Sequence, residues 1–166
     1  MTEVFTGAIS SGNLALDILL AALWSAAASG CFAVCLNAFR HNIIESASLG
    51  AIGWVLYLAV FGRTGSQFAG YFAGAFAVGT FAEILASILK KPASIFILPG
   101  FLPLVPGGGM FNTMEAALNN NLETAATLGY QTLGAAGAIA LGIALASSAA
   151  RIIRRLQIHS KLTKPR

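Results

Sequence analysis

Residues 92–109 constrain the fold of this chain more than any other stretch. The run is apolar, yet it holds four prolines and four glycines in eighteen residues. Proline has no backbone N–H to donate within a helix, and its ring clashes with the preceding turn. The sequence therefore excludes one continuous helix here. Such broken backbone is stable in a membrane only where protein or a water-filled cavity shelters it. Transporters place binding sites at breaks of this kind, so we take the run as the candidate site.

The composition is that of an integral membrane protein. Hydrophobic residues make up 57% of the chain and charged residues only 10%, whereas a typical globular chain is roughly 25% charged. A membrane-spanning helix takes roughly 20 apolar residues. We therefore predict an all-α, polytopic transmembrane helix bundle of about five segments, the fourth broken by Pro and Gly. The predicted segments are 14–39, 46–62, 67–89, 93–118 and 123–150, which make residues 1–150 a transmembrane domain and leave 151–166 as a basic tail.

The distribution of positive charge predicts the orientation of the chain. Six of the ten basic residues follow Ala150. If the N-terminus lies outside and the chain crosses the membrane five times, nine of the ten basic residues lie on the cytoplasmic side. These nine are the six of the tail together with Arg40, Lys90 and Lys91. Only Arg63 then lies outside. This agreement with the positive-inside rule predicts a multi-pass protein of the cell (inner or plasma) membrane, with its C-terminus in the cytoplasm.

The remaining signals exclude several classes of protein. A basic cluster directly after a long apolar segment is typical of an anchor to anionic lipid headgroups, and no nucleic-acid module accompanies it. His41 and His159 fall at the ends of segments and no paired acidic motif occurs, so we do not expect an enzyme. Cys31 and Cys35 have no further ligands in sequence reach and are interpreted as packing residues. We expect neither a metal nor a cofactor.

Small residues at four-residue spacing indicate faces on which helices approach closely. The third segment carries Gly70, Gly74, Ala75 and Gly79, and the fifth carries Gly134, Ala138, Gly142 and Ala146. Helix packing explains both patterns fully. They therefore predict seams within a bundle or between subunits, and they do not identify a substrate.

The break itself supplies groups that bind anions. We expect the helix to unwind from Pro99 to Gly109 and to restart near Met110, which frees amide groups at a helix N-terminus. Such an end carries a partial positive charge and binds the carboxylate of an amino acid or organic acid. Glycine lets a ligand approach these amides closely. The alternative is that Pro and Gly only kink the helix.

Polar and acidic side chains near the break complete the candidate site. The substrate-binding candidates are Gly107, Gly108, Gly109, Asn112, Thr113 and Gln131, and the proton-coupling candidates are Glu83 and Glu115. A buried carboxylate is costly unless paired or protonated, which makes Glu83 a candidate proton carrier. Alternatively, the Glu83 side chain extends to Lys90 or Lys91 at the membrane interface. Gln131 either lines the cavity or packs between helices.

The motif Pro92-x-x-x-Phe96-x-x-Pro99-Gly100-x-x-Pro103-Leu104-Val105-Pro106-Gly107 resembles the threonine/serine exporter (ThrE) family. The resemblance is to the small subunit, which corresponds to the C-terminal half of fused exporters, and it extends over nearly the whole chain. It adds Pro99, Gly100, Pro103, Pro106 and Gly107 to the candidate site as motif positions. It implies export of small carboxylate-bearing metabolites, threonine and serine or succinate-like dicarboxylates, driven by the proton motive force.

The resemblance also implies a partner. The other half of the family's exporter is a larger membrane subunit, so we expect a hetero-oligomeric secondary transporter whose broken fourth helix lines the substrate site. The competing interpretation is a non-catalytic structural or assembly subunit, in which the broken helix only shapes an interface with the larger transport complex.

Overall fold

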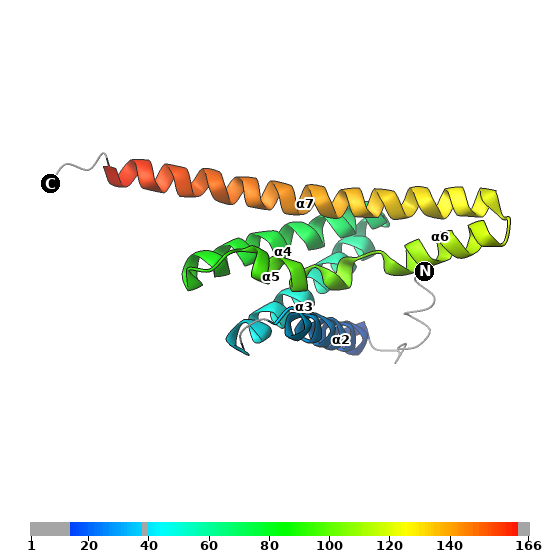
Figure 1. Ribbon diagram of the computed structural model, residues 1–166, viewed down its shortest axis with the longest axis horizontal. Coiled ribbons are helices and arrows are strands. Elements are labelled where there is room, and N and C mark those ends of the chain that lie inside the picture. The colour runs from blue at the N-terminus through cyan, green and yellow to red at the C-terminus, as the bar shows by residue number, and fades with distance from the viewer. Residues whose placement is uncertain (1–13, 38–39, 163–166) are drawn as a thin grey trace.

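A computed structural model describes residues 14–37 and 40–162, and every regular element in these ranges is helical (Figure 1). The elements in chain order are α2 (Leu14–Cys35), α3 (Arg40–Thr64), α4 (Gln67–Leu89), α5 (Ser94–Gly100), the 3-10 helix η1 (Leu102–Leu104), α6 (Gly107–Leu118) and α7 (Leu122–Leu162). The prediction of an all-α bundle is confirmed.

Four helices are long and apolar enough to cross a membrane, within Leu16–Cys35, Asn42–Thr64, Gln67–Leu89 and Leu122–Ile153. A fifth span is formed if Ser94–Leu104 and Gly107–Leu118 are counted together, as a pair bent by 52°. The predicted count of about five segments with a broken fourth is therefore confirmed.

The helices do not begin and end where the predicted membrane segments do. α3 begins at Arg40 rather than at 46, and α7 continues past 150 to Leu162, through three quarters of the predicted tail. Mean hydropathy falls where the charged residues begin. The helix nevertheless continues through this charged stretch, because arginine, leucine and glutamine are good helix formers. The first helix ends at Cys35, and residues 1–13, 38–39 and 163–166 lie outside the described ranges.

The break in the fourth segment is shorter than predicted. α5 continues through Pro99 and Gly100, and α6 already begins at Gly107 instead of near Met110. Pro99 lacks its own N–H donor, but the Phe101 N–H still donates to the Ile97 carbonyl at 3.0 Å and closes the last turn of α5. The unwound part is therefore residues 101–106, with η1 inside it.

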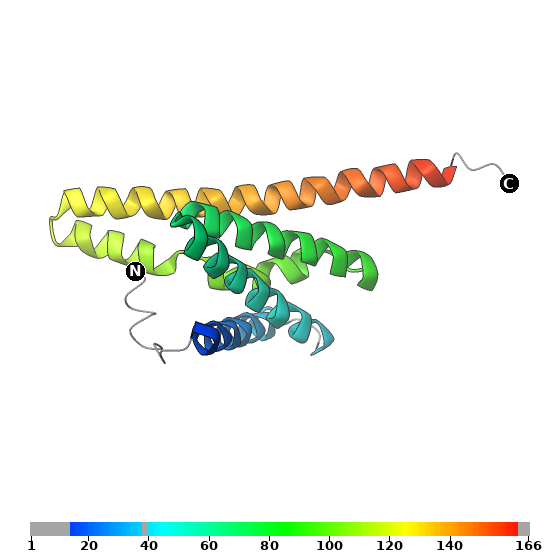
Figure 2. The same ribbon diagram turned by 180° about the vertical axis from the view of Figure 1, so that it is seen from behind.

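The helices form layers between α7 and α2. Figures 1 and 2 show α7 along one side of the molecule and α2 on the opposite side, with α3, α4 and α5 between them. α6 runs back along the first part of α7, to which it is joined by a short turn at residues 119–121. This arrangement places η1 against α2, α3 and α4, and it places α6 beside the first part of α7.

Glycines allow the helix backbones to approach closely at two seams. A Cβ on Gly74 of α4 would lie 2.7 Å from the Gly53 carbonyl oxygen of α3. A Cβ on Gly142 of α7 would lie 2.8 Å from the Phe72 carbonyl oxygen and 2.9 Å from the Phe76 nitrogen of α4. The predicted use of small residues as helix seams is confirmed at both positions.

The broken segment is anchored by two side chains that are fully buried. Leu104 of η1 belongs to a cluster with Tyr57, Val78 and Ile139, and Phe96 of α5 belongs to another with Leu49, Ala82 and Ala86. These contacts hold α5 and η1 against α3 and α4. They fix where α6 begins, and thus where its N-terminus lies.

A polar contact ties α3 to the connection between α4 and α5. The Lys91 Nζ donates to Oδ1 of the fully buried Asn42 at 2.7 Å. A hydrogen bond to a charged group contributes about 1.5–3 kcal/mol, so Asn42→Leu is expected to lower the melting temperature of the purified chain clearly. Ser48→Ala, an exposed change on the same helix, is the control. Equal melting temperatures for the two variants would show that this contact does not stabilise the fold.

Candidate substrate site at the break in the fourth segment

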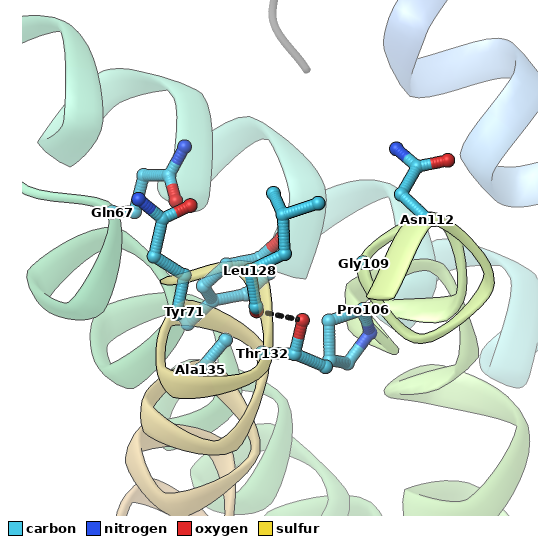
Figure 3. Close-up of a pocket in the computed structure, with 9 residues that line it drawn as sticks. Gln67, Tyr71, Pro106, Gly109, Asn112, Leu128, Thr132 and Ala135 are labelled. Atoms are coloured by element: carbon cyan, nitrogen blue, oxygen red, sulfur yellow. Dashed lines mark hydrogen bonds between the residues drawn. The ribbon is translucent and has the colours of Figure 1, made fainter. Parts of the chain in front are cut away.

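A pocket of about 130 Å³ lies where α4, the start of α6 and α7 meet (Figure 3). Nine residues from these helices and from the break line it: Gln67, Tyr71, Pro106, Gly109, Asn112, Leu128, Gln131, Thr132 and Ala135. The pocket is therefore built from three segments that are distant in sequence.

Neutral hydrogen-bonding groups dominate the polar part of the lining. Gln67, Asn112 and Gln131 contribute side-chain amides, which both donate and accept hydrogen bonds. Figure 3 shows Gln67 and Asn112 on opposite sides, with Leu128 and Thr132 between them. No lining residue carries a formal charge. The pocket thus offers donors and acceptors without a net charge of its own.

The N-terminus of α6 reaches this pocket through Pro106 and Gly109. The Gly107 N–H donates to the Val105 carbonyl at 2.8 Å and the Met110 N–H donates to the Pro106 carbonyl at 3.1 Å. Within the part of the chain that the structure describes, the amides of Gly108 and Gly109 have no backbone acceptor. The first turn of a helix leaves such donors available to a ligand, and the helix dipole favours an anion there.

Local hydrogen bonds fix the walls of the pocket. The Thr132 Oγ1 donates to the Leu128 carbonyl at 2.7 Å, shown dashed in Figure 3. The Thr113 Oγ1 donates to the Gly109 carbonyl at 2.7 Å, which engages the Thr113 hydroxyl within α6. The ring of Tyr71 packs on Tyr57 of α3, with centroids 4.6 Å apart. Apart from Pro106, the lining residues lie on the regular helices α4, α6 and α7.

The structure brings together four of the residues expected at the site, which are Pro106, Gly109, Asn112 and Gln131. The other motif positions lie elsewhere. Pro99 and Gly100 are buried in α5, where a Cβ on Gly100 would lie 3.1 Å from both Leu49 and Val78. These two residues therefore pack α5 against α3 and α4.

The remaining candidates of the broken segment also lie outside the pocket. Pro103 is half-buried in η1, Gly107 and Gly108 are exposed, and a Cβ on Gly107 would meet nothing within 4 Å. Thr113 does not line the pocket, and Glu115 is exposed on α6. Only one face of α6 therefore contributes to the pocket.

Glu83 lies at a second concavity, toward the other end of α4. This groove between α4 and α7 has a volume of about 370 Å³ and is lined by Phe76, Thr80, Glu83, Ile84, Ser87, Ile88, Ala146, Ala149, Ala150 and Ile153. It shares no lining residue with the pocket at the break. Glu83 and the candidate substrate site are thus separate places in the fold.

Five lining residues were not expected from the sequence: Gln67, Tyr71, Leu128, Thr132 and Ala135. Gln67 and Tyr71 are spaced by four and share a helix face, which is a weak signal for a common role. Nothing in the sequence indicates that this face meets the start of α6. Long-range packing alone places them at the site.

Residues of metal-binding type are scattered. Among the side chains that the structure describes, no three His, Cys, Asp or Glu residues form a group that could hold a metal ion. Cys31 and Cys35, interpreted from sequence as packing residues, are exposed on α2. The pocket at the break is lined instead by amides, hydroxyls and apolar groups.

Comparison with known proteins agrees with the motif at the break. Residues 21–149 match the family described as threonine/serine exporter, ThrE, which covers most of the 166 residues. No curated protein and no solved structure matches the chain. With its four to five membrane-spanning segments, this is a multi-pass membrane protein. The chain belongs to the threonine/serine exporter (ThrE) family, a family of transporters.

Proposed function

We propose that the chain is the small subunit of a secondary exporter of small carboxylate-bearing metabolites, which binds its substrate in the pocket at the break. Its larger partner is the other membrane subunit of the same exporter. The N-terminus lies outside and the C-terminus in the cytoplasm, so the pocket opens near the outer end of α4. The basic end of α7 then lies at anionic lipid headgroups on the cytoplasmic side.

One observation carries this proposal: the N-terminus of α6 and three side-chain amides converge on one pocket. The helix end favours a carboxylate, and the amides of Gln67, Asn112 and Gln131 suit the other polar groups of a metabolite. The pocket has a volume of about 130 Å³, which is well below the roughly 300–1,000 Å³ of pockets that hold drug-sized ligands. A substrate with few non-hydrogen atoms fits these dimensions.

The neutral lining favours an amino acid over a dicarboxylate. Threonine and serine are zwitterions without net charge, whereas a dicarboxylate brings two negative charges. Burying a charge without a compensating partner is costly, and no lysine or arginine lines the pocket. We therefore propose threonine or serine as the preferred substrate and a succinate-like dicarboxylate as the weaker one.

Gly109 provides the test of the pocket. Gly109 is buried in the lining, so Gly109→Leu is expected to lower threonine export about tenfold by filling the space of the substrate. Gly107→Leu is the matched control, because its side chain points into open space. Export is measured in cells that express both subunits and lack other exporters.

The same pair of variants separates this function from a purely structural one. If the break only shapes an interface, Gly109→Leu reduces recovery of the larger subunit and leaves the export per assembled complex unchanged. Full export by Gly109→Leu contradicts the site directly.

We assign proton coupling to Glu83 rather than Glu115, because Glu83 is half-buried on α4 whereas Glu115 is exposed near the end of α6. We expect Glu83→Gln to flatten the pH dependence of export, since a glutamine side chain cannot take up or release a proton. Glu115→Gln is expected to keep the wild-type pH profile. A retained profile in both variants would place the coupling group in the partner subunit.

A further inference from the structure

Three buried polar side chains between α2 and α3 hold hydrogen-bonding atoms that the rest of the fold does not use. Ser29 of α2 and Asn42 and Ser46 of α3 are fully buried. Within residues 14–37 and 40–162, the Ser29 Oγ, the Asn42 Nδ2 and the Ser46 Oγ have no hydrogen-bond partner. Buried polar groups are almost always paired with protein or with ordered water. Three unpaired atoms between the same two helices therefore indicate a bound ligand.

Two contacts show that α2 and α3 run antiparallel where they meet. The Ser25 Oγ donates to the Gly50 carbonyl at 2.7 Å. Further along α2, a Cβ on Gly30 would lie 3.5 Å from the Ala47 Cβ, which is earlier in α3 than Gly50. Each step forward along α2 is therefore matched by a step back along α3.

This register brings the three unpaired atoms together. One turn after Ser25 on α2 comes Ser29. One turn before Gly50 on α3 comes Ser46, so the two serines lie at the same level. The Ser29 Oγ also lies against Gly50, where a Cβ would overlap with it. Asn42 lies one turn before Ser46 on the same face of α3, so two hydroxyls and an amide N–H gather within about one helical turn.

The chemistry of these three groups favours water over an ion. Water both donates and accepts hydrogen bonds, as a hydroxyl does, and a buried water typically makes about three of them. Asn42 offers only N–H donors here, because its Oδ1 accepts from the Lys91 Nζ at 2.7 Å. That ammonium repels a metal cation. An anion would need the same ammonium as its counter-charge, and the Asn42 Oδ1 already engages it.

We propose that α2 and α3 enclose a bound water molecule, which donates to the Ser29 and Ser46 hydroxyls and accepts from the Asn42 N–H. The site lies within the membrane spans Leu16–Cys35 and Asn42–Thr64, where lipid offers no hydrogen bonds. The water links α3 to α2, the helix on the opposite side of the molecule from α7 (Figures 1 and 2). The site shares no residue with the pocket at the break, and it does not rest on the proposed function.

The sign of a change in melting temperature tests the water in the purified full chain. Ser29→Ala and Ser46→Ala each remove one partner of the water and leave the other hydroxyl unpaired. Each is expected to lower the melting temperature by about 3 °C. The double variant should lose about as much as one single variant, because the bridge is lost only once.

A site without water gives the opposite sign. Each alanine would then remove a buried hydroxyl that has no partner, and both single variants would melt at or above the wild-type temperature. That result overturns the proposal. Ser48→Ala is the matched control for the helix propensity of alanine, since Ser48 is exposed on the same helix as Ser46.

Asn42 distinguishes a bridging water from a direct bond between the two serines. A shared water couples Ser29 to Asn42, so the losses of melting temperature in Ser29→Ala and Asn42→Leu should combine to less than their sum. Full additivity of this pair, with coupling between the two serines only, indicates a direct hydroxyl–hydroxyl bond and overturns the proposal.

The wild-type chain provides an independent test that needs no substitution. An experimental structure that resolves ordered water should place one molecule within about 3.2 Å of both the Ser29 and the Ser46 hydroxyl. Hydroxyls bonded directly to each other, or an ion in the place of the water, would contradict the assignment.

Discussion

Export of threonine is expected to fall about 100-fold when Asn112 and Gln131 are both replaced by leucine, because each hydrogen bond to a charged group of the zwitterion is worth about a factor of ten or more. The two amides reach the pocket from different helices, α6 and α7, so neither replaces the other. Each single variant is expected to lose about tenfold. Initial rates of efflux from preloaded cells measure the effect.

Asn119→Leu is the control for the double variant. Asn119 caps the end of α6 and is exposed, and it does not line the pocket. It should reach the membrane in the same amount as the double variant and export at nearly the wild-type rate. Wild-type export by the double variant would exclude both amides from substrate binding.

The largest expected effect on the fold comes from Gly142→Leu. Its Cβ would lie 2.8 Å from the Phe72 carbonyl oxygen and 2.9 Å from the Phe76 nitrogen, which are backbone atoms of α4. A rotamer change cannot relieve this overlap, so α4 and α7 must separate at a cost of about 3 kcal/mol or more. We expect a strong loss of monodisperse protein after detergent extraction and a lower melting temperature of what remains.

Gly137→Leu is the matched control on the same helix. A Cβ at position 137 meets nothing within 4 Å, and leucine is favoured there by both helix propensity and lipid. This variant should be at least as stable as the wild type. Similar melting temperatures for the two variants would contradict the close α4–α7 seam.

The sequence predicts most of the bundle because apolar segments of sufficient length and small-residue seams are local signals. Gly74 and Gly142 could be recognised as contact positions, although their partners on α3 and α4 could not. The extension of α7 to Leu162 is not predictable from hydropathy, because hydropathy marks the end of the apolar stretch and not the end of the helix.

The candidate site is less predictable than the fold. The motif marks where the backbone breaks, but it does not distinguish Gly109, which lines the pocket, from Gly107, which faces open space. That difference depends on the helical phase of α6, which follows from its start at Gly107. Gln67 joins the site only because α4 packs beside the break, and a contact across so many residues leaves no local pattern.

A substrate that binds in the pocket should protect a cysteine placed there from chemical labelling. Gln131→Cys is made in a chain whose exposed Cys31 and Cys35 are replaced by alanine, and the larger subunit is co-expressed. A maleimide that does not cross membranes is added from outside, with and without threonine, serine or succinate. If the substrate binds in the pocket at the break, threonine or serine should slow the labelling of this cysteine, and succinate should slow it less. Equal labelling rates with and without all three metabolites would contradict a substrate site at the break.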